Sequence, residues 1–443
     1  MLRKIIAVAV VLSMSGISYA VEVDFDGAKK TQLQNLDNSA SISAVTAEKI
    51  SNLEIEVPEM DSLNKKTKGS AEWTIMVFVN SKNNLERYGL KDVNEMEMVG
   101  SSDKVNVVVQ MGRMSGFDAS EGDWKGTRRY LIQKDDNINS VTSPIVEEMG
   151  KVDMGDWKEL VKFAKWAKDK YPAKKYMLTV WNHGSGWEKS ITTTKGISYD
   201  DETGNHINTP QLGMAINEIG RLDIYSSDAC LMQMASVDYE IKDNVTYIVG
   251  SEETEPGDGY TYNTMLEPIV ANPTMTAFQT AKVVVDAYSD HYQSMSVSYT
   301  QSLVRTSSLA KFLNLVNEWA YAVTEAGDKA IVKSAISGTQ SYAMSDNKDL
   351  YHFVSLIEGK TTSADVKEKG KALKSYIKAS VVGHNRWNSS SGGWYGPEDY
   401  SNSHGIAIYL PSYSYNKDYS KLKWANYSNW DEFIQWYLAK DAE

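Results

Sequence analysis

Short apolar runs alternate along the chain with longer amphipathic segments. The apolar runs, rich in Val and Ile, predict strands, and the segments with apolar residues every three or four positions predict helices. Strands are expected at 73–80, 105–111, 130–132, 176–182, 222–226 and 247–251, with helices between them at 85–99, 157–170, 210–220 and 231–242. Such alternation is typical of a mainly parallel sheet covered on both faces. The pattern therefore predicts an α/β fold with its functional site at the carboxyl ends of the strands.

The segment that precedes this pattern has a different character. Residues 1–20 combine a positive start, a short apolar run at 5–12 and small residues at the end, which predicts a signal peptide and a secreted or periplasmic protein. Residues 21–70 are polar and predict a pro-segment or linker. No later run approaches the roughly 18 consecutive apolar residues of a membrane span, so we expect no membrane-spanning segment after the signal peptide.

The second half of the chain is predicted to be largely helical. Helices are expected at 273–290, 306–325, 348–358, 364–379 and 429–439, with a Gly/Ser/Trp-rich loop at 387–401 and a late strand at 404–411. We therefore divide the mature chain into an α/β domain, 71–270, and a helical C-terminal region, 271–443. The late strand is expected to return to the main sheet.

The charge of the chain narrows the choice of partners. The formal net charge is -12, and removing the signal peptide makes it more negative, because that peptide carries Arg3 and Lys4 and no acidic residue. An acidic surface disfavours nucleic acid and anionic membranes as partners. We expect a monomer that meets protein or peptide substrates.

The chain contains a single cysteine, Cys230. Free cysteine is often a small buried apolar residue, and this alternative stays open from the count alone. An exposed thiol outside the cell is liable to oxidation, so the retention of one cysteine favours a chemical use. The surrounding sequence must decide between the two.

His183 and Cys230 each follow a predicted strand. Neighbouring strands lie under about 5 Å apart, so side chains that leave their ends can meet. An imidazole can take the proton of a thiol and later protonate a leaving amine. The alternatives are a strand-end histidine bonded to backbone, and His404 as a competing base.

Two further features favour thiol chemistry at this edge. Gly184 allows a close backbone approach, so its N–H and that of Cys230 could form an oxyanion hole. The helix predicted at 231–242 would direct its positive end at the sulfur and lower its pKa.

Five segments resemble the clostripain family of cysteine peptidases. They are WTIMVFVNSKNNLE (73–86), LTVWNHGSGW (178–187), DACLMQMASVDYE (228–240), GSEETEPGDGYTYN (250–263) and HGIAIYLP (404–411). The resemblance implies a caspase-like three-layer α/β/α fold, related to gingipain and legumain, and a dyad of His183 and Cys230. It also implies cleavage after Arg or Lys, and maturation by a cut between the histidine and the cysteine.

An acidic group in the specificity pocket would pair with a basic substrate side chain. Asp228 and Asp258 match acidic pocket positions of the family motifs, although Asp258 in a Gly-Asp-Gly sequence is also ordinary turn chemistry. Glu252 and Glu253 are second choices. Lys195, in the polar stretch between base and nucleophile, is the candidate autocleavage site, with a plain surface loop as the alternative.

Other readings of the chain remain open at this point. No cofactor is required, but the acidic run 200–205 would suit calcium, although its spacing is not that of an EF-hand and such runs are usually solvated. A secreted binding protein that keeps the fold without turnover is the alternative to an enzyme. Ser185 as nucleophile is the third reading, but its flanking Gly-Ser-Gly lacks the G-x-S-x-G elbow.

Overall fold

The computed structural model describes residues 71–187, 196–393 and 396–440. The predicted signal peptide (1–20), the predicted pro-segment (21–70) and Lys195 lie outside the described residues, so these expectations stay predictions. No helix of the described part is both long enough and apolar enough to cross a membrane.

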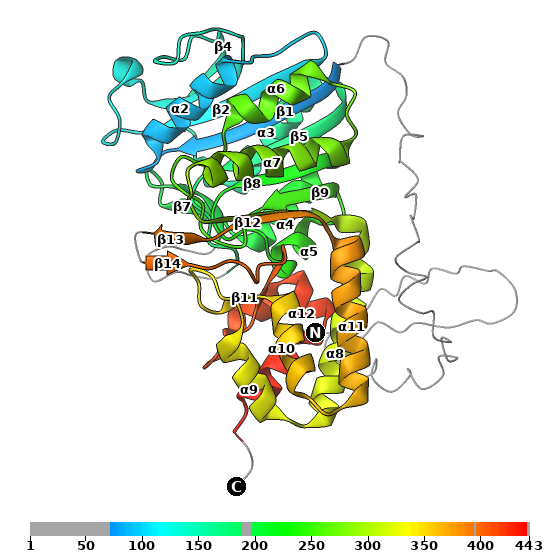
Figure 1. Ribbon diagram of the computed structural model, residues 1–443. Coiled ribbons are helices and arrows are strands. Elements are labelled where there is room, and N and C mark those ends of the chain that lie inside the picture. The colour runs from blue at the N-terminus through cyan, green and yellow to red at the C-terminus, as the bar shows by residue number, and fades with distance from the viewer. Residues whose placement is uncertain (1–70, 188–195, 394–395, 441–443) are drawn as a thin grey trace, which may run out of the picture. The chain divides into compact units, whose positions relative to one another are not determined.

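A mixed sheet forms the centre of the fold (Figure 1). Its nine strands, in the described part of the chain, lie in the order β12-β10-β9-β8-β5-β1-β2-β3-β4. The strands are β1 (Ala71–Ser81), β2 (Val105–Arg113), β3 (Gly126–Leu131), β4 (Ile145–Gly150), β5 (Ala173–Trp181), β8 (Leu222–Asp228), β9 (Val245–Gly250), β10 (Tyr299–Arg305) and β12 (Val382–Asn388). The central strands β2, β1, β5, β8 and β9 are parallel, and the outer pairs are antiparallel. The predicted parallel α/β sheet is therefore confirmed.

Helices cover both faces of this sheet because its central strands are apolar on both sides. In β1, Ile75, Val77 and Val79 belong to one buried cluster, whereas Met76 and Phe78 belong to the other. The first face packs on α2 (Glu86–Glu97), α6 (Tyr262–Ala271) and α7 (Ala277–Ser294), and the second on α3 (Trp157–Lys170), α4 (Thr209–Ile219) and α5 (Ala235–Ile241) (Figure 1). The result is the three-layer α/β/α arrangement.

The C-terminal region is largely helical, as predicted. Its helices are α8 (Leu309–Ala326), α9 (Lys329–Gly338), α10 (Leu350–Lys360), α11 (Ala364–Tyr376), α12 (Lys423–Tyr427) and α13 (Trp430–Leu438). Their apolar faces share one buried cluster with α3, α4 and α5, so this region and the sheet have a continuous core. Two strands of the main sheet, β10 and β12, also come from residues after 270.

The late strand does not return to the main sheet, and this expectation is wrong. β15 (Ala407–Tyr409) pairs instead with β11 (Asn347–Asp349) in a separate two-stranded sheet. It also forms one parallel bridge from Ala407 to Met234, just after Cys230. The apolar run is buried as its composition requires, but burial alone does not select the pairing partner.

Short hairpins complete the described structure. β6 (Ile197–Asp200) pairs with β7 (Asn205–Ile207), and β13 (Ser390–Gly393) pairs with β14 (Gly396–Glu398). The predicted loop at 387–401 therefore contains the end of β12 and this second hairpin. β7, β13 and β14 lie on the side at which the parallel strands end (Figure 1).

Candidate active site

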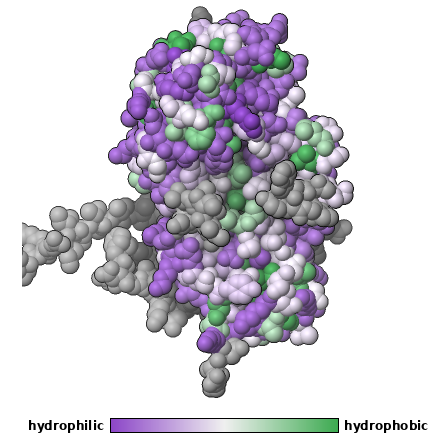
Figure 2. Space-filling view, turned by 90° about the vertical axis from the view of Figure 1, so that its left-hand side faces the viewer, coloured by the Kyte–Doolittle hydropathy of each residue, from purple (hydrophilic) through white to green (hydrophobic). Residues whose placement is uncertain are grey.

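His183 and Cys230 leave neighbouring parallel strands at equivalent positions. β5 and β8 are paired so that Trp181 lies opposite Asp228, and each candidate residue follows two positions later. The N–H of Asn182 donates to the Asp228 carbonyl at 3.2 Å, which extends the pairing past the strand ends. The expectation that both loops lie at one edge of the sheet agrees with this register. That edge faces the viewer in Figure 2, where hydrophilic residues cover most of the surface.

The backbones of the two loops touch at Gly184. A Cβ atom on Gly184 would lie 2.4 Å from the Cys230 carbonyl oxygen and 3.2 Å from its nitrogen. Gly186, with a φ of +61°, packs similarly, because a Cβ there would lie 2.7 Å from Sδ of Met234. The histidine loop therefore fits against the cysteine loop only with glycine at these points.

The imidazole of His183 is held by a residue that sequence analysis missed. Its Nε2 lies 2.8 Å from Oδ1 of Asn84, in the turn between β1 and α2. Asn83 anchors this turn, since its side-chain amide donates to the Tyr199 carbonyl at 2.9 Å. An amide oxygen can only accept, so Nε2 carries the proton and Nδ1 is left as the basic nitrogen. Its position in the sequence could have indicated this contact, because Asn84 follows β1, which is the other neighbour of β5 in the sheet.

Burial lowers the pKa of His183 below its usual value, and the charge of Asp201 opposes this shift. The imidazole is therefore neutral at pH 7, which is the state that a general base needs.

The thiol of Cys230 is half-buried and in its neutral form. Its Sγ accepts a hydrogen bond from the Glu255 N–H at 3.3 Å. Burial nevertheless raises the pKa of the thiol to about 12, and the charges of Glu255 and Glu253 act in the same direction. The predicted helix at 231–242 does not help, because α5 begins only at Ala235 and has seven residues. The expectation that a helix N-terminus abuts the sulfur is wrong.

The two predicted acidic pocket residues have different surroundings. Asp228 is buried, and its carboxylate accepts the Tyr260 N–H at 3.1 Å and the Tyr262 hydroxyl at 2.8 Å. Burial raises the pKa of Asp228 to about 7. Asp258 lies on a turn with its side chain 44% exposed, 3.5 Å from Nζ of Lys91. Asp228 is thus close to Cys230 along β8, whereas Asp258 is on the surface.

The second-choice acids anchor the segment that follows β9. The Glu253 carbonyl accepts the Leu231 N–H at 3.0 Å, beside Cys230. Its carboxylate accepts the N–H of Ala343 and the hydroxyl of Tyr400, both at 3.0 Å. Glu252 accepts the Gly405 N–H at 3.0 Å. These carboxylates therefore tie the cysteine loop to the C-terminal region.

The competing residues have other partners. The hydroxyl of Ser185 is bonded to that of Tyr199 at 2.9 Å and accepts the Gly196 N–H at 3.1 Å, so it serves the loop structure. His404 stacks on Tyr351 at 4.2 Å, and its Nδ1 lies 3.1 Å from Asp349. Neither arrangement forms a nucleophile and base pair.

The acidic run at 200–205 is already paired with a lysine side chain of the protein, Lys82. Nζ of Lys82 lies 2.8 Å from Glu202 and 3.6 Å from Asp200, and donates to the Val152 carbonyl at 2.5 Å. Its ammonium thus offsets part of the negative charge of this run. In the described ranges, no group of three or more His, Cys, Asp and Glu side chains could hold a metal.

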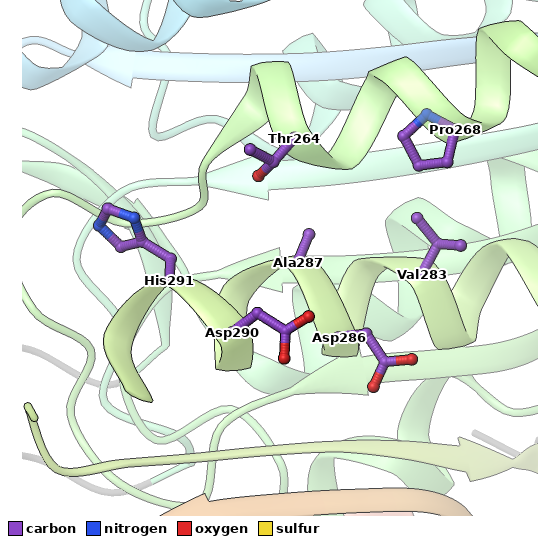
Figure 3. A pocket seen from close by; sticks show the side chains of 7 residues that line it. All are labelled: Thr264, Pro268, Val283, Asp286, Ala287, Asp290 and His291. Atoms are coloured by element: carbon purple, nitrogen blue, oxygen red, sulfur yellow. The ribbon is translucent and has the colours of Figure 1, made fainter. Parts of the chain in front are cut away.

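A surface pocket of about 360 Å³ lies between α6 and α7 (Figure 3). It is lined by Thr264, Pro268, Val283, Asp286, Ala287, Asp290 and His291. Asp286 there pairs with His384 at 2.7 Å. None of the candidate catalytic residues lines this pocket, so it is separate from the site described above.

The three-layer fold is that of solved C11 cysteine proteases. A secreted C11 cysteine protease from Bacteroides thetaiotaomicron, in complex with an irreversible peptide inhibitor, matches with a TM-score of 0.62 and 19% identity over 81% of this chain and 99% of that one. An inactive zymogen C11 protease from Parabacteroides distasonis matches with a TM-score of 0.63 and 18% identity over 82% and 99%.

The family follows from the sequence. The profile of the clostripain family matches residues 77–437. Clostripain of Hathewaya histolytica is 28% identical over 250 residues, which is 51% of this chain and 47% of that protein, so the match spans about half of the relative. The chain belongs to the clostripain family of cysteine peptidases.

Proposed function

We propose that this protein is a secreted cysteine endopeptidase that cleaves peptide bonds after Arg or Lys. Cys230 is the nucleophile, His183 is the general base, and the N–H groups of Gly184 and Cys230 form the oxyanion hole. The observation that carries the proposal is the contact of the two loops, where a Cβ on Gly184 would lie 2.4 Å from the Cys230 carbonyl. Family membership supports the same chemistry.

The reaction is an acyl transfer in two steps. Nδ1 of His183 takes the thiol proton, and the thiolate of Cys230 attacks the scissile carbonyl. The oxyanion hole stabilises the tetrahedral intermediate, which collapses to a thioester as the imidazolium gives its proton to the leaving amine. Water, deprotonated by His183, then releases the acid and restores the thiol. Asn84 holds the ring for both transfers through Nε2.

Asp228 and Asp258 are the proposed acidic determinants of Arg or Lys specificity. Burial favours Asp228, because an ion pair in a desolvated pocket is stronger than one on the surface. Asp258 has a surface position near Lys91 and would act at the rim.

The protein is proposed to be made as a zymogen that cleaves itself. The pKa of about 12 for the Cys230 thiol suits a chain that has not yet been activated. A cut after Lys195 would separate the His183 segment from the Cys230 segment, and Lys65, Lys66 and Lys68 would serve to remove the front segment. Secretion through residues 1–20 agrees with the solved relative described as secreted.

Fluorogenic arginyl and lysyl amides test the proposal. Wild-type protein should hydrolyse them and lose this activity after treatment with iodoacetamide, while Cys230→Ala should be inactive. On a denaturing gel the wild type should run as two fragments and Cys230→Ala as one. Hydrolysis that survives alkylation would exclude the thiol mechanism, and a folded wild type without hydrolysis of any basic amide would favour the binding-protein alternative.

A further inference from the structure

We propose that Glu255 joins Asp228 in a two-carboxyl recess for the basic substrate side chain, and that the pair shares one proton until that side chain binds. This inference rests on the proposed cleavage after Arg or Lys. It adds a specificity residue that the sequence motifs did not indicate, and a pH response of substrate binding that one carboxylate alone would not have.

Glu255 is placed beside the nucleophile by its own backbone. Its N–H donates to Sγ of Cys230 at 3.3 Å, while its Oε1 accepts the side-chain amide of Gln301 at 3.2 Å. Asp228 reaches the same region from two residues before Cys230. Its Oδ1 accepts the Tyr260 N–H at 3.1 Å, and Nε2 of Gln301 lies 3.2 Å from Oε1 of Glu255 and 3.3 Å from the Tyr260 hydroxyl. The two carboxyls interact with each other through a hydrogen bond. Two acidic groups therefore meet next to the atom that attacks the substrate.

The recess has more acceptors than donors. Two buried oxygens beside the pair have no hydrogen-bond partner among the described residues, namely Oε1 of Gln301 and Oδ1 of Asp92. Gln301 and Asp92 are fully buried, and Nε2 of Gln301 is used by Glu255 and Tyr260. Buried acceptors without donors are costly, so the arrangement fits a guest that carries donors. A guanidinium brings five N–H groups and an ammonium three.

The charges around the pair are almost all negative or neutral. The groups that face it are Asp92, Glu95 and Lys91 from α2, Asp258, Tyr260 and Tyr262 from the segment after β9, Tyr288 and Tyr292 from α7, and Cys230. Among these groups the cation is Lys91. Its side chain is 42% exposed, and its Nζ lies 3.0 Å from the Glu95 carboxylate and 3.5 Å from the Asp258 carboxylate. No cation of the described chain therefore contacts the pair directly.

Two adjacent buried carboxyls cannot both ionise at low cost, so they retain a proton. Burial raises the pKa of both groups. The charge and the hydrogen bond of Asp228 raise the pKa of Glu255 further, whereas the hydrogen bond from Glu255 lowers the pKa of Asp228, so the shared proton belongs on Glu255. A guest cation supplies the missing positive charge, so its arrival releases the shared proton to solvent. Binding of a basic side chain should accordingly strengthen as pH rises through the titration of the pair.

The test compares Glu255→Gln with the wild type on arginyl and citrullinyl amides of the same peptide from pH 5 to 9. Citrulline keeps the shape and lacks the charge. The wild type should prefer arginine, with a KM that falls as pH rises. Glu255→Gln should lose roughly 10- to 100-fold in kcat/KM for arginine, as for a hydrogen bond to a charged group, while citrulline hydrolysis changes little and the pH response of KM flattens.

Glu255→Asp, which keeps the carboxyl group, should restore the pH response of KM in part. Glu218→Gln is the matched control, because the Glu218 side chain is 51% exposed and paired with Lys165. Alkylation of Cys230 that is at least as fast in Glu255→Gln as in the wild type would show that the nucleophile is intact, because loss of the Glu255 charge can only lower the pKa of the thiol. An arginine preference and pH response unchanged in Glu255→Gln would overturn the role of Glu255 alone. A wild type that cleaves citrulline as well as arginine would instead refute the proposed specificity.

Discussion

Replacement of Gly184 by alanine perturbs the contact on which the proposed mechanism depends. The new Cβ would lie 2.4 Å from the Cys230 carbonyl oxygen, 3.0 Å from Cβ of Ala229 and 3.2 Å from the Cys230 nitrogen. Two of these three neighbours are backbone atoms, which cannot rotate away. To regain ordinary van der Waals separation, the two loops must move apart by on the order of 1 Å.

A displacement of this size between reacting groups costs on the order of 100-fold in rate. We therefore expect Gly184→Ala to lower kcat/KM for an arginyl amide by about that factor, because His183 moves away from the thiol and the oxyanion hole widens. Gly359→Ala is the matched control, since a Cβ at that position in α10 would have no atom within 4 Å apart from its chain neighbours and the backbone of its own helix. A Gly359→Ala variant should have wild-type activity.

The assay is steady-state hydrolysis, with thermal unfolding to show that both variants fold. The test also needs the rate of Cys230 alkylation, which reports whether the thiol is still accessible. If a folded Gly184→Ala variant hydrolyses the amide within a few-fold of the wild-type rate, the two loops are not in the contact described, and the reasoning fails.

Three further predictions concern residues around the site. Asn84→Ala should lower kcat/KM about fivefold, the value of one neutral hydrogen bond. Asn84→Asp should raise the pKa of His183 and move the acid limb of the pH–rate profile to higher pH. Identical pH–rate profiles for Asn84→Asp and the wild type would contradict the contact between Asn84 and His183. Lys82→Met should cost about 3–5 kcal/mol in urea unfolding, because it leaves Asp200 buried without its cation, and an unchanged midpoint would count against this. Alkylation of Cys230 in the intact chain should rise steadily from pH 7 to 10, since a pKa of about 12 keeps the thiol protonated there; a plateau below pH 8 would disprove it.

The sequence predicted best those features that local pattern determines. The apolar runs identified the central strands, and the helix predicted at 157–170 has those bounds in the structure, where Asp156 caps its start. The carboxyl edge and the positions of His183 and Cys230 followed from strand order. In these cases local propensity and burial agree.

Features that depend on distant partners were missed. β10 and β12 carry many polar residues, such as Gln301 and Ser302 in β10 and His384 and Asn385 in β12, so no apolar run revealed them. Their antiparallel pairing extends the sheet with residues far along the chain. The run at 404–411 was apolar enough to be seen, but its partner, β11, could not be read from it.

The same limit applies to the site. Asn84 and Glu255 lie in turns, and their roles depend on contacts with residues distant in sequence. Asn84 contacts His183, and Glu255 contacts Asp228 and Cys230. Asp258 had the stronger motif, yet its turn is on the surface, whereas Glu255 three residues earlier contacts the sulfur through its backbone. Spacing alone could not separate them.

The central claim is that His183 takes the thiol proton of Cys230 and that the Cys230 sulfur then forms the covalent bond to the substrate. It is tested most directly by incubating the activated protein with a biotinylated arginyl acyloxymethyl ketone and locating the label by peptide mass spectrometry. We expect one adduct, on Cys230, that is lost in Cys230→Ala and forms more slowly in His183→Ala. Label on another residue, or label on Cys230 at the same rate without the imidazole, would contradict it.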